Sequence, residues 1–139
     1  GRPSSGAEDH YTQLEKRARK LETYEFGDHW AEIEGSGDTA IVTWGSITAV
    51  VREARDRLKE KTGKDIKVIS LRLLMPAQTE KFAAALEGVD TVLVIEQSHS
   101  KQFYRYLRAF FDLPRSVRVI NKPGPLPFRP GELLTEIEA

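Results

Sequence analysis

The clearest hydrophobic pattern in the chain is residues 91–95, five β-favouring residues with no polar interruption. Such a run is typical of a strand buried on both faces, as in the middle of a parallel sheet. Residues 39–44 have nearly the same character, and stretches with apolar residues at helical spacing lie between the apolar runs. The pattern predicts strands at 30–34, 39–44, 65–71, 91–95 and 116–120, and helices at 8–22, 47–61, 79–86, about 103 to 113, and 130–137. This alternation predicts one three-layer α/β/α domain.

Single residues at the ends of these segments predict where helices start and stop. Ser46 is expected to cap the helix at 47–61, and Thr79 the helix at 79–86, because a hydroxyl can accept a bond from an unpaired backbone N–H. Gly63 suits the left-handed conformation that ends a helix. Pro130 suits the first position of the last helix.

The first helix, 8–22, has a narrow apolar stripe of Tyr11, Leu14, Ala18 and Leu21, and its other positions are mostly charged or polar. It is expected either to pack along the outside of the domain or to link the domain to another part of a longer chain. Its basic run at 16–20 is interpreted as a solvated face rather than an anion site. Residues 1–7 are expected to be disordered or introduced by cloning, 8–22 to be a linker helix, and 23–139 to form the α/β domain.

Composition excludes several classes of function. The 139 residues carry 21 Lys plus Arg and 21 Asp plus Glu, so no net charge attracts nucleic acid or an acidic membrane. The chain has no cysteine, which excludes disulfides and thiolate metal sites and fits a cytoplasmic location. No apolar run approaches the roughly 20 residues of a membrane span.

Polar residues follow two of the strongest predicted strands. Gly45 and Ser46 follow the strand at 39–44, whereas Glu96 and Gln97, with Gln102 a little further on, follow the strand at 91–95. Ligands and partners are usually bound at such strand-to-helix turns in an open α/β sheet. These five residues are therefore the candidate crevice or docking residues.

The Glu96 carboxylate is the most specific of these candidates. A carboxylate at the end of a buried strand is partly desolvated and needs donors, such as backbone N–H groups of the neighbouring loop. A structural hydrogen-bonding role, a domain or subunit contact and ligand binding all remain open for it.

No arrangement of residues predicts a reaction centre. The glycine-rich fingerprints of nucleotide sites are missing, and Gly45-Ser46 is only a fragment of such a turn. The histidines at 10, 29 and 99 are scattered, so no metal site is predicted. The tryptophans at 30 and 44 are interpreted as core or interface residues. No catalytic residue is assigned.

A set of short motifs in a fixed order gives the sequence a family resemblance. The motifs are His10 with residues 16–21, Trp44-Gly45-Ser46, Arg52-Glu53-Ala54 with Arg57-Leu58, residues 71–76, Ile95-Glu96-Gln97 with Ser100 and Gln102, Leu107-Arg108, and Gly124 with Pro127-Phe128. Together they resemble the C-terminal part of the α subunit of 2-oxoacid:ferredoxin (2-oxoacid:acceptor) oxidoreductases, the group that contains 2-oxoglutarate:ferredoxin oxidoreductase. The resemblance covers nearly the whole chain from residue 8.

The resemblance implies the transketolase C-terminal-like fold, a five-stranded mixed sheet ordered 1-3-2-4-5 with the first strand antiparallel. Residues 35–38, Gly-Ser-Gly-Asp, would on their own favour a hairpin between the first two strands. In the implied order, strands two and four are neighbours. The turns at Gly45-Ser46 and Glu96-Gln97 are then expected to border one crevice.

The function that the resemblance implies is oxidative decarboxylation of a 2-oxoacid, such as 2-oxoglutarate, to an acyl-CoA, with electrons passed to ferredoxin. That reaction uses thiamine diphosphate, Mg²⁺, iron–sulfur clusters and CoA as co-substrate. The cofactors are expected in an upstream thiamine pyrimidine-binding domain and in the β subunit. This chain is therefore expected to hold no cofactor, to be inactive alone, and to dock onto those two partners.

Two other readings remain. The chain could be a binding module for a small anion or CoA, using the crevice beside Ser46 and Glu96. It could also be the equivalent domain of a transketolase or of a 2-oxoacid dehydrogenase E1β chain.

One departure from the family affects the candidate loop. Where the family commonly reads Glu-Gln-Asn-Tyr-Ser-Gly-Gln, this chain has Lys101 at the position of the glycine. A lysine predicts that no positive φ is required there, because side chains disfavour that conformation. It also places a cation near the start of a helix, where the helix dipole disfavours it.

Overall fold

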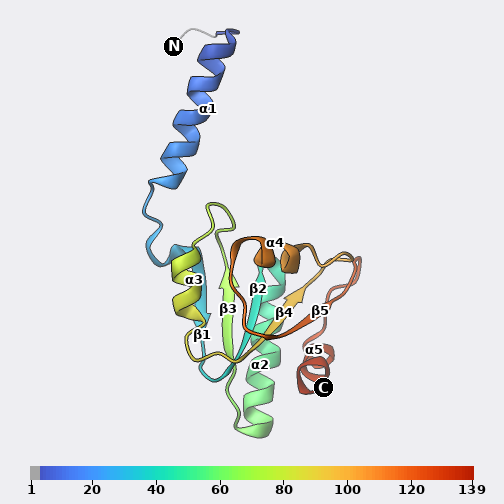
Figure 1. Ribbon diagram of the computed structural model, residues 1–139. Helices are drawn as coiled ribbons and strands as arrows, with labels where there is room; N and C mark the ends of the chain where they lie inside the picture. The colour runs from blue at the N-terminus through green and yellow to red at the C-terminus, as the bar shows by residue number, and fades with distance from the viewer. Residues whose placement is uncertain (1–3) are drawn as a thin grey trace.

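The computed structural model describes residues 4–139, and residues 1–3 of the predicted N-terminal segment 1–7 lie outside it. A five-stranded sheet forms the centre of the domain, ordered β1-β3-β2-β4-β5 (Figure 1). The strands are β1 (Ala31–Glu34), β2 (Thr39–Trp44), β3 (Lys67–Leu71), β4 (Thr91–Glu96) and β5 (Ser116–Asn121). β1 is antiparallel to β3, and the other neighbours pair in parallel. The strand order and the α/β/α class predicted above are confirmed.

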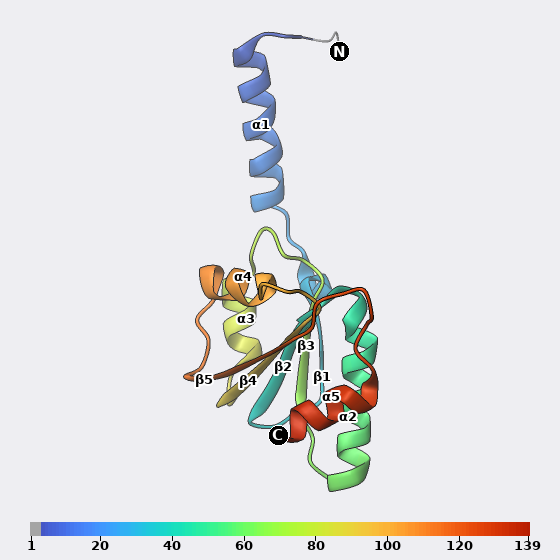
Figure 2. The ribbon, with the colours of Figure 1, turned by 90° about the vertical axis from the view of Figure 1, so that its right-hand side faces the viewer.

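Helices cover both faces of the sheet. The α-helices are α1 (Ala7–Glu22), α2 (Thr48–Thr62), α3 (Thr79–Ala85), α4 (Gln102–Phe110) and α5 (Pro130–Glu138), and the 3-10 helices are η1 (Gly27–Trp30) and η2 (Gly45–Ile47). α3 and α4 lie on one face, whereas α2 and α5 lie side by side on the other (Figure 2). Both faces of the central strands are therefore buried.

The buried residues explain why the central strands do not alternate between apolar and polar residues. In β4, Val92 and Val94 pack with α3 and α4, whereas Leu93 and Ile95 pack with α2 and α5. A strand that is covered on both sides needs apolar side chains at every position.

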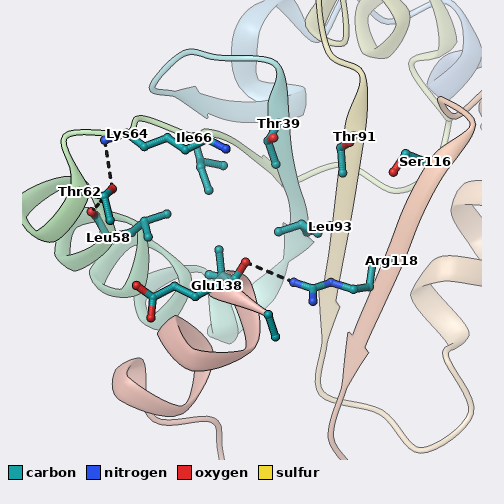
Figure 3. Close-up of a pocket in the computed structure, with 12 residues that line it drawn as sticks. Thr39, Leu58, Thr62, Lys64, Ile66, Thr91, Leu93, Ser116, Arg118 and Glu138 are labelled. Carbon is teal, nitrogen blue, oxygen red and sulfur yellow. Dashed lines mark hydrogen bonds between the residues drawn. The ribbon is translucent and has the colours of Figure 1, made fainter.

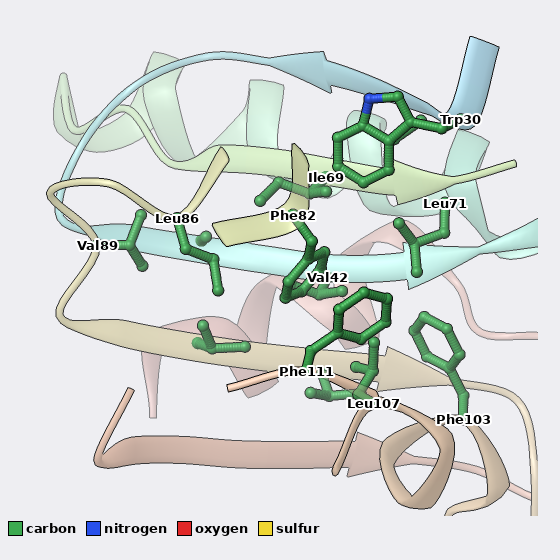
Figure 4. Packing of buried hydrophobic residues seen from close by; sticks show 14 residues of the cluster. Trp30, Val42, Ile69, Leu71, Phe82, Leu86, Val89, Phe103, Leu107 and Phe111 are labelled. Carbon is green, nitrogen blue, oxygen red and sulfur yellow. The ribbon is translucent and has the colours of Figure 1, made fainter. Parts of the chain in front are cut away.

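Aromatic rings fill the layer between the sheet and α3 (Figure 4). The rings of Phe82 and Phe111 have centroids 4.2 Å apart, and Trp30 meets Phe82 at 6.4 Å in an edge arrangement. The sequence left open whether Trp30 is a core or an interface residue, and the structure shows that it belongs to the core.

The connection from β1 to β2 is not a hairpin. It turns at Gly35 and Gly37, both with positive φ, and passes the beginning of β3. β1 then pairs with β3, so that Ala31 lies opposite Leu71. The local preference of residues 35–38 for a hairpin is therefore overruled by the pairing of β1 with β3, which begins 33 residues after β1 ends (67 minus 34).

Two helix caps differ from the sequence prediction. Ser46 is not the N-cap of α2: it lies inside η2, Ile47 occupies the cap position, and no side-chain cap bond forms. The 3-10 turn instead lets the Thr48 backbone N–H donate to the carbonyl of Gly45. Thr79 is the first residue of α3 rather than its cap.

Two other helix ends match the prediction. Gly63 has φ 73° and its N–H donates to the Lys59 carbonyl at 2.8 Å, which ends α2 in the left-handed conformation. Pro130 occupies the first position of α5.

The first helix, α1, extends away from the sheet and none of its residues is buried (Figures 1 and 2). It therefore does not pack along the outside of the domain, which was one of the two alternatives for this segment. The division of the chain into a linker helix and a domain stays a prediction.

Candidate functional site

The predicted site residues lie at the carboxyl ends of β2 and β4. These strands are parallel neighbours, with Val42 opposite Val94. The Thr43 hydroxyl donates to the Ile95 carbonyl at 2.9 Å and joins the two strand ends inside the core. We refer to this side of the domain, formed by the carboxyl ends of β2 to β5 and the loops that follow them, as the carboxyl edge.

Glu96 is the last residue of β4, and it is 2% exposed. Its carboxylate accepts three hydrogen bonds: from the Ser98 hydroxyl at 2.6 Å, from the backbone N–H of Phe103 at 2.9 Å, and from that of Tyr104 at 3.0 Å. The two N–H groups belong to the first turn of α4, where they have no partner within the helix. Glu96 thus caps α4 from the neighbouring strand, and its negative charge suits the positive end of the helix dipole.

The loops after β4 and β5 are tied to each other by side-chain amides. The Asn121 amide donates to the carbonyls of Ser98 at 3.0 Å and His99 at 3.3 Å. The Gln97 amide donates to the Leu126 carbonyl at 3.1 Å. Gln97, a predicted site residue, therefore holds the β5–α5 loop against the carboxyl edge.

Lys101 contradicts the expectation drawn from its side chain. It has φ 54° and ψ 46°, so it is left-handed, and it is the only non-glycine residue with positive φ among residues 4–139. The chain needs this conformation because it must turn sharply at Lys101 for the first N–H groups of α4 to reach the Glu96 carboxylate. Tertiary hydrogen bonds thus impose a conformation that a lysine disfavours.

Replacing this lysine by glycine is expected to stabilise the domain. Lys101→Gly should raise the free energy of unfolding by about 1 kcal/mol, because it removes the left-handed penalty and a cation at the start of α4. Urea unfolding followed by circular dichroism measures the change. Lys101→Ala removes the charge but keeps the penalty, so a gain as large from alanine as from glycine would contradict the conformational explanation.

Gly45 and Ser46 line a pocket of about 630 Å³ beside α2 and β3. Glu96, Gln97 and Gln102 do not line it, and Glu96 lies buried beneath α4. The structure therefore brings two of the five candidates to this pocket and puts the other three into the β4–α4 connection.

The charges in this pocket are paired with one another. Arg52 contacts the carboxylates of Glu32 and Glu34, and the Arg72 guanidinium lies 2.9 Å from Glu32. The hydrogen bond from Arg52 holds the pKa of Glu32 below its ordinary value, against a smaller effect of burial that raises it. With each guanidinium paired to a carboxylate, the pocket offers little positive charge for a small anion.

Three large apolar side chains are exposed at the carboxyl edge. Trp44 ends β2, Met75 follows β3, and Leu126 follows β5, with exposed fractions of 45%, 58% and 68%. All three lie on the side of the domain where β2, β3 and β5 end, so apolar side chains from three separate segments face solvent there. Sequence reasoning did not select Met75 or Leu126, although each stands next to a proline in a loop after a strand.

The opposite edge holds a second pocket, of about 650 Å³, at the amino ends of the strands (Figure 3). The hydroxyls of Thr39, Thr91 and Ser116 lie along it. The Arg118 guanidinium in this pocket donates a hydrogen bond to the Ile137 carbonyl at 3.3 Å, near the end of α5. Glu138, which also lines the pocket, is paired with the Lys61 ammonium at 2.7 Å.

Residues 4–139 lack two further features. No group of three or more His, Cys, Asp or Glu side chains is placed to hold a metal ion. Each helix described here is too short or too polar to span a bilayer.

Solved structures with the same architecture include three informative relatives. The 2-oxoglutarate:ferredoxin oxidoreductase from Magnetococcus marinus with 2-oxoglutarate, coenzyme A and succinyl-CoA bound is 27% identical, with a TM-score of 0.71 over 99% of this chain and 24% of that chain. A transketolase from Campylobacter jejuni is 22% identical, with a TM-score of 0.55 over 81% of this chain and 19% of that chain. The α chain of a probable 2-oxoacid ferredoxin oxidoreductase from Thermoplasma acidophilum is 20% identical, with a TM-score of 0.50 over 79% of this chain and 95% of that chain.

The chain thus corresponds to about a quarter of the Magnetococcus marinus chain, and the other two likenesses show the fold alone. A comparison with curated protein sequences finds no significant match. The family model described as "Transketolase, C-terminal domain" matches residues 28–136, which is most of the chain. The protein belongs to the transketolase C-terminal domain family.

Proposed function

We propose that this chain is the non-catalytic docking domain of the α subunit of a thiamine-diphosphate-dependent 2-oxoacid:ferredoxin oxidoreductase. The enzyme would convert a 2-oxoacid such as 2-oxoglutarate to an acyl-CoA in the cytoplasm. The similarity to the Magnetococcus marinus enzyme covers α1 as well as the domain, whereas the similarity to transketolase covers less of the chain. This difference supports assignment to an oxidoreductase rather than to a transketolase.

The observation that carries the docking role is the exposed apolar surface of Trp44, Met75 and Leu126 at the carboxyl edge. The chain enters the domain at this same edge, because β1 is antiparallel and Ala31 lies opposite Leu71. An upstream domain that is joined through α1 would therefore lie on the same side of this domain as a partner that binds the carboxyl edge. We propose that the thiamine pyrimidine-binding domain and the β subunit are those partners, with ferredoxin as the acceptor of the complex.

The residues of this chain do not fit the cofactors of that reaction. Residues 4–139 hold no cluster of acidic or histidine side chains suited to the Mg²⁺ that accompanies thiamine diphosphate, and the chain has no cysteine to ligate an iron–sulfur cluster. The Glu96 carboxylate is already occupied by three donors of its own chain. We therefore assign no reaction step to this chain.

The proposal is tested in the whole α subunit assembled with its β subunit. Leu126→Lys is expected to weaken assembly at least about tenfold and to lower ferredoxin reduction by the 2-oxoacid and CoA in parallel, because it puts a charge into the apolar contact. Ile33→Lys is the matched control: Ile33 is 46% exposed but lies on the edge strand β1. Size-exclusion chromatography with light scattering measures assembly.

The isolated chain of 139 residues is expected to show no turnover with any 2-oxoacid. Acceptor reduction by the chain alone would overturn the proposal. So would equal effects of Leu126→Lys and Ile33→Lys on assembly, since the docking surface would then not lie at the carboxyl edge.

A further inference from the structure

The helix α1 carries an apolar stripe that no other part of residues 4–139 covers. None of its residues is buried, and it extends away from the domain (Figure 2). A helix of 16 residues is only marginally stable by itself in water, and most helices are stabilised by packing of an apolar face. The stripe therefore requires a partner.

The spacing of the stripe identifies the kind of partner. Its residues follow one another at intervals of four, three, four and three, which is the spacing of the a and d positions of a heptad repeat. The a positions are Tyr11 and Ala18, and the d positions are Ala7, Leu14 and Leu21. We call these five residues the α1 seam. A two-residue seam per heptad is the pattern of a two-stranded coiled coil rather than of a helix on a sheet.

The charges beside the α1 seam select the second helix and its direction. All three e positions are glutamates, Glu8, Glu15 and Glu22, and the g positions are His10 and Arg17. In a parallel pair each g residue meets the next e residue of the other helix, so Arg17 meets Glu22, and His10 meets Glu15. In an antiparallel pair e meets e and g meets g, which would set glutamate against glutamate.

We propose that α1 forms a parallel, in-register coiled coil with α1 of a second copy of this chain. The same seam and the same flanking charges would serve both copies, as a two-fold interface requires. Both domains would then stand at one end of the coiled coil. This inference does not rest on the proposed function.

A charge reversal with a matched control tests the pairing. Sedimentation equilibrium of the 139-residue chain, from about 10 μM to about 1 mM, is expected to show a monomer–dimer equilibrium. Arg17→Glu should weaken the dimer at least about tenfold, whereas Lys16→Glu, the same charge change at an outward-facing f position, should not. Adding Glu22→Arg to Arg17→Glu should restore the dimer, because the g-to-e attraction returns with its signs exchanged.

A cysteine at the end of the α1 seam tests the direction. The chain has no cysteine, so Ala7→Cys provides a single thiol. In a parallel pair the two thiols face each other and should form a disulfide rapidly under mild oxidation. In an antiparallel pair they would lie about 24 Å apart, the length of the 16-residue helix.

Three results would overturn the proposal. These are a monomer over the whole concentration range, a dimer that Arg17→Glu and Lys16→Glu weaken equally, and a dimer in which Ala7→Cys does not cross-link. The first would assign the α1 seam to a different protein segment.

Discussion

Replacing Glu96 by alanine is expected to lower the free energy of unfolding by about 3 kcal/mol. The substitution leaves the N–H groups of Phe103 and Tyr104 and the Ser98 hydroxyl without their acceptor, and of these residues Phe103 is buried. A buried donor without a partner costs far more than a hydrogen bond gains, because its desolvation is not compensated. Urea unfolding monitored by circular dichroism gives the value.

Glu96→Gln separates the loss of charge from the loss of the acceptor. The amide keeps the shape and one acceptor oxygen, so a loss of about 1 to 2 kcal/mol is expected. Hydrogen exchange adds a local readout: the amides of Phe103 and Tyr104 should exchange faster in both variants relative to amides of β2. A loss below 1 kcal/mol for Glu96→Ala would show that Glu96 does not hold α4 in place.

The sequence predicts those features that follow from burial of continuous segments. The strand at 91–95 was recognisable because residues facing α3 and residues facing α2 are equally apolar. The desolvated carboxylate of Glu96 was also recognisable, since a charge that ends a buried strand must find donors. In both cases the local pattern and the tertiary structure require the same residue types.

Features that depend on distant partners could not be predicted from local pattern. Lys101 is left-handed because Glu96 binds the start of α4, and nothing in the lysine side chain indicates this. The order of β1, β3 and β2 came from the family resemblance, since the local signal at residues 35–38 favours the wrong pairing.

The exposed residues of the carboxyl edge are a second feature that the sequence does not predict. Met75 and Leu126 are apolar residues next to prolines, and their sequence context resembles that of loop residues that pack inward, such as Phe128. Only the structure distinguishes the two cases. The α1 seam is the reverse: its spacing is visible in the sequence, but the structure was needed to show that the domain leaves it uncovered.

Gly35→Ala is expected to lower the free energy of unfolding by about 3 kcal/mol. Gly35 has φ 74°, and a Cβ atom there would stand 2.5 Å from the carbonyl oxygen of Ile66 and 2.9 Å from the Arg55 guanidinium. The carbonyl belongs to the backbone just before β3, so it cannot move without shifting the strand that pairs with both β1 and β2. The cost therefore combines an unfavourable φ with a steric overlap.

Gly63→Ala isolates the first of these two contributions. Gly63 has nearly the same φ, 73°, but a Cβ atom there would meet nothing within 4 Å. Only the left-handed penalty of about 1 kcal/mol should remain. Urea unfolding of the two variants should therefore differ by about 2 kcal/mol, the difference between those two costs. Equal losses would show that the β1–β2 connection has room to relax away from the Ile66 carbonyl, and that steric overlap adds nothing to the cost at Gly35.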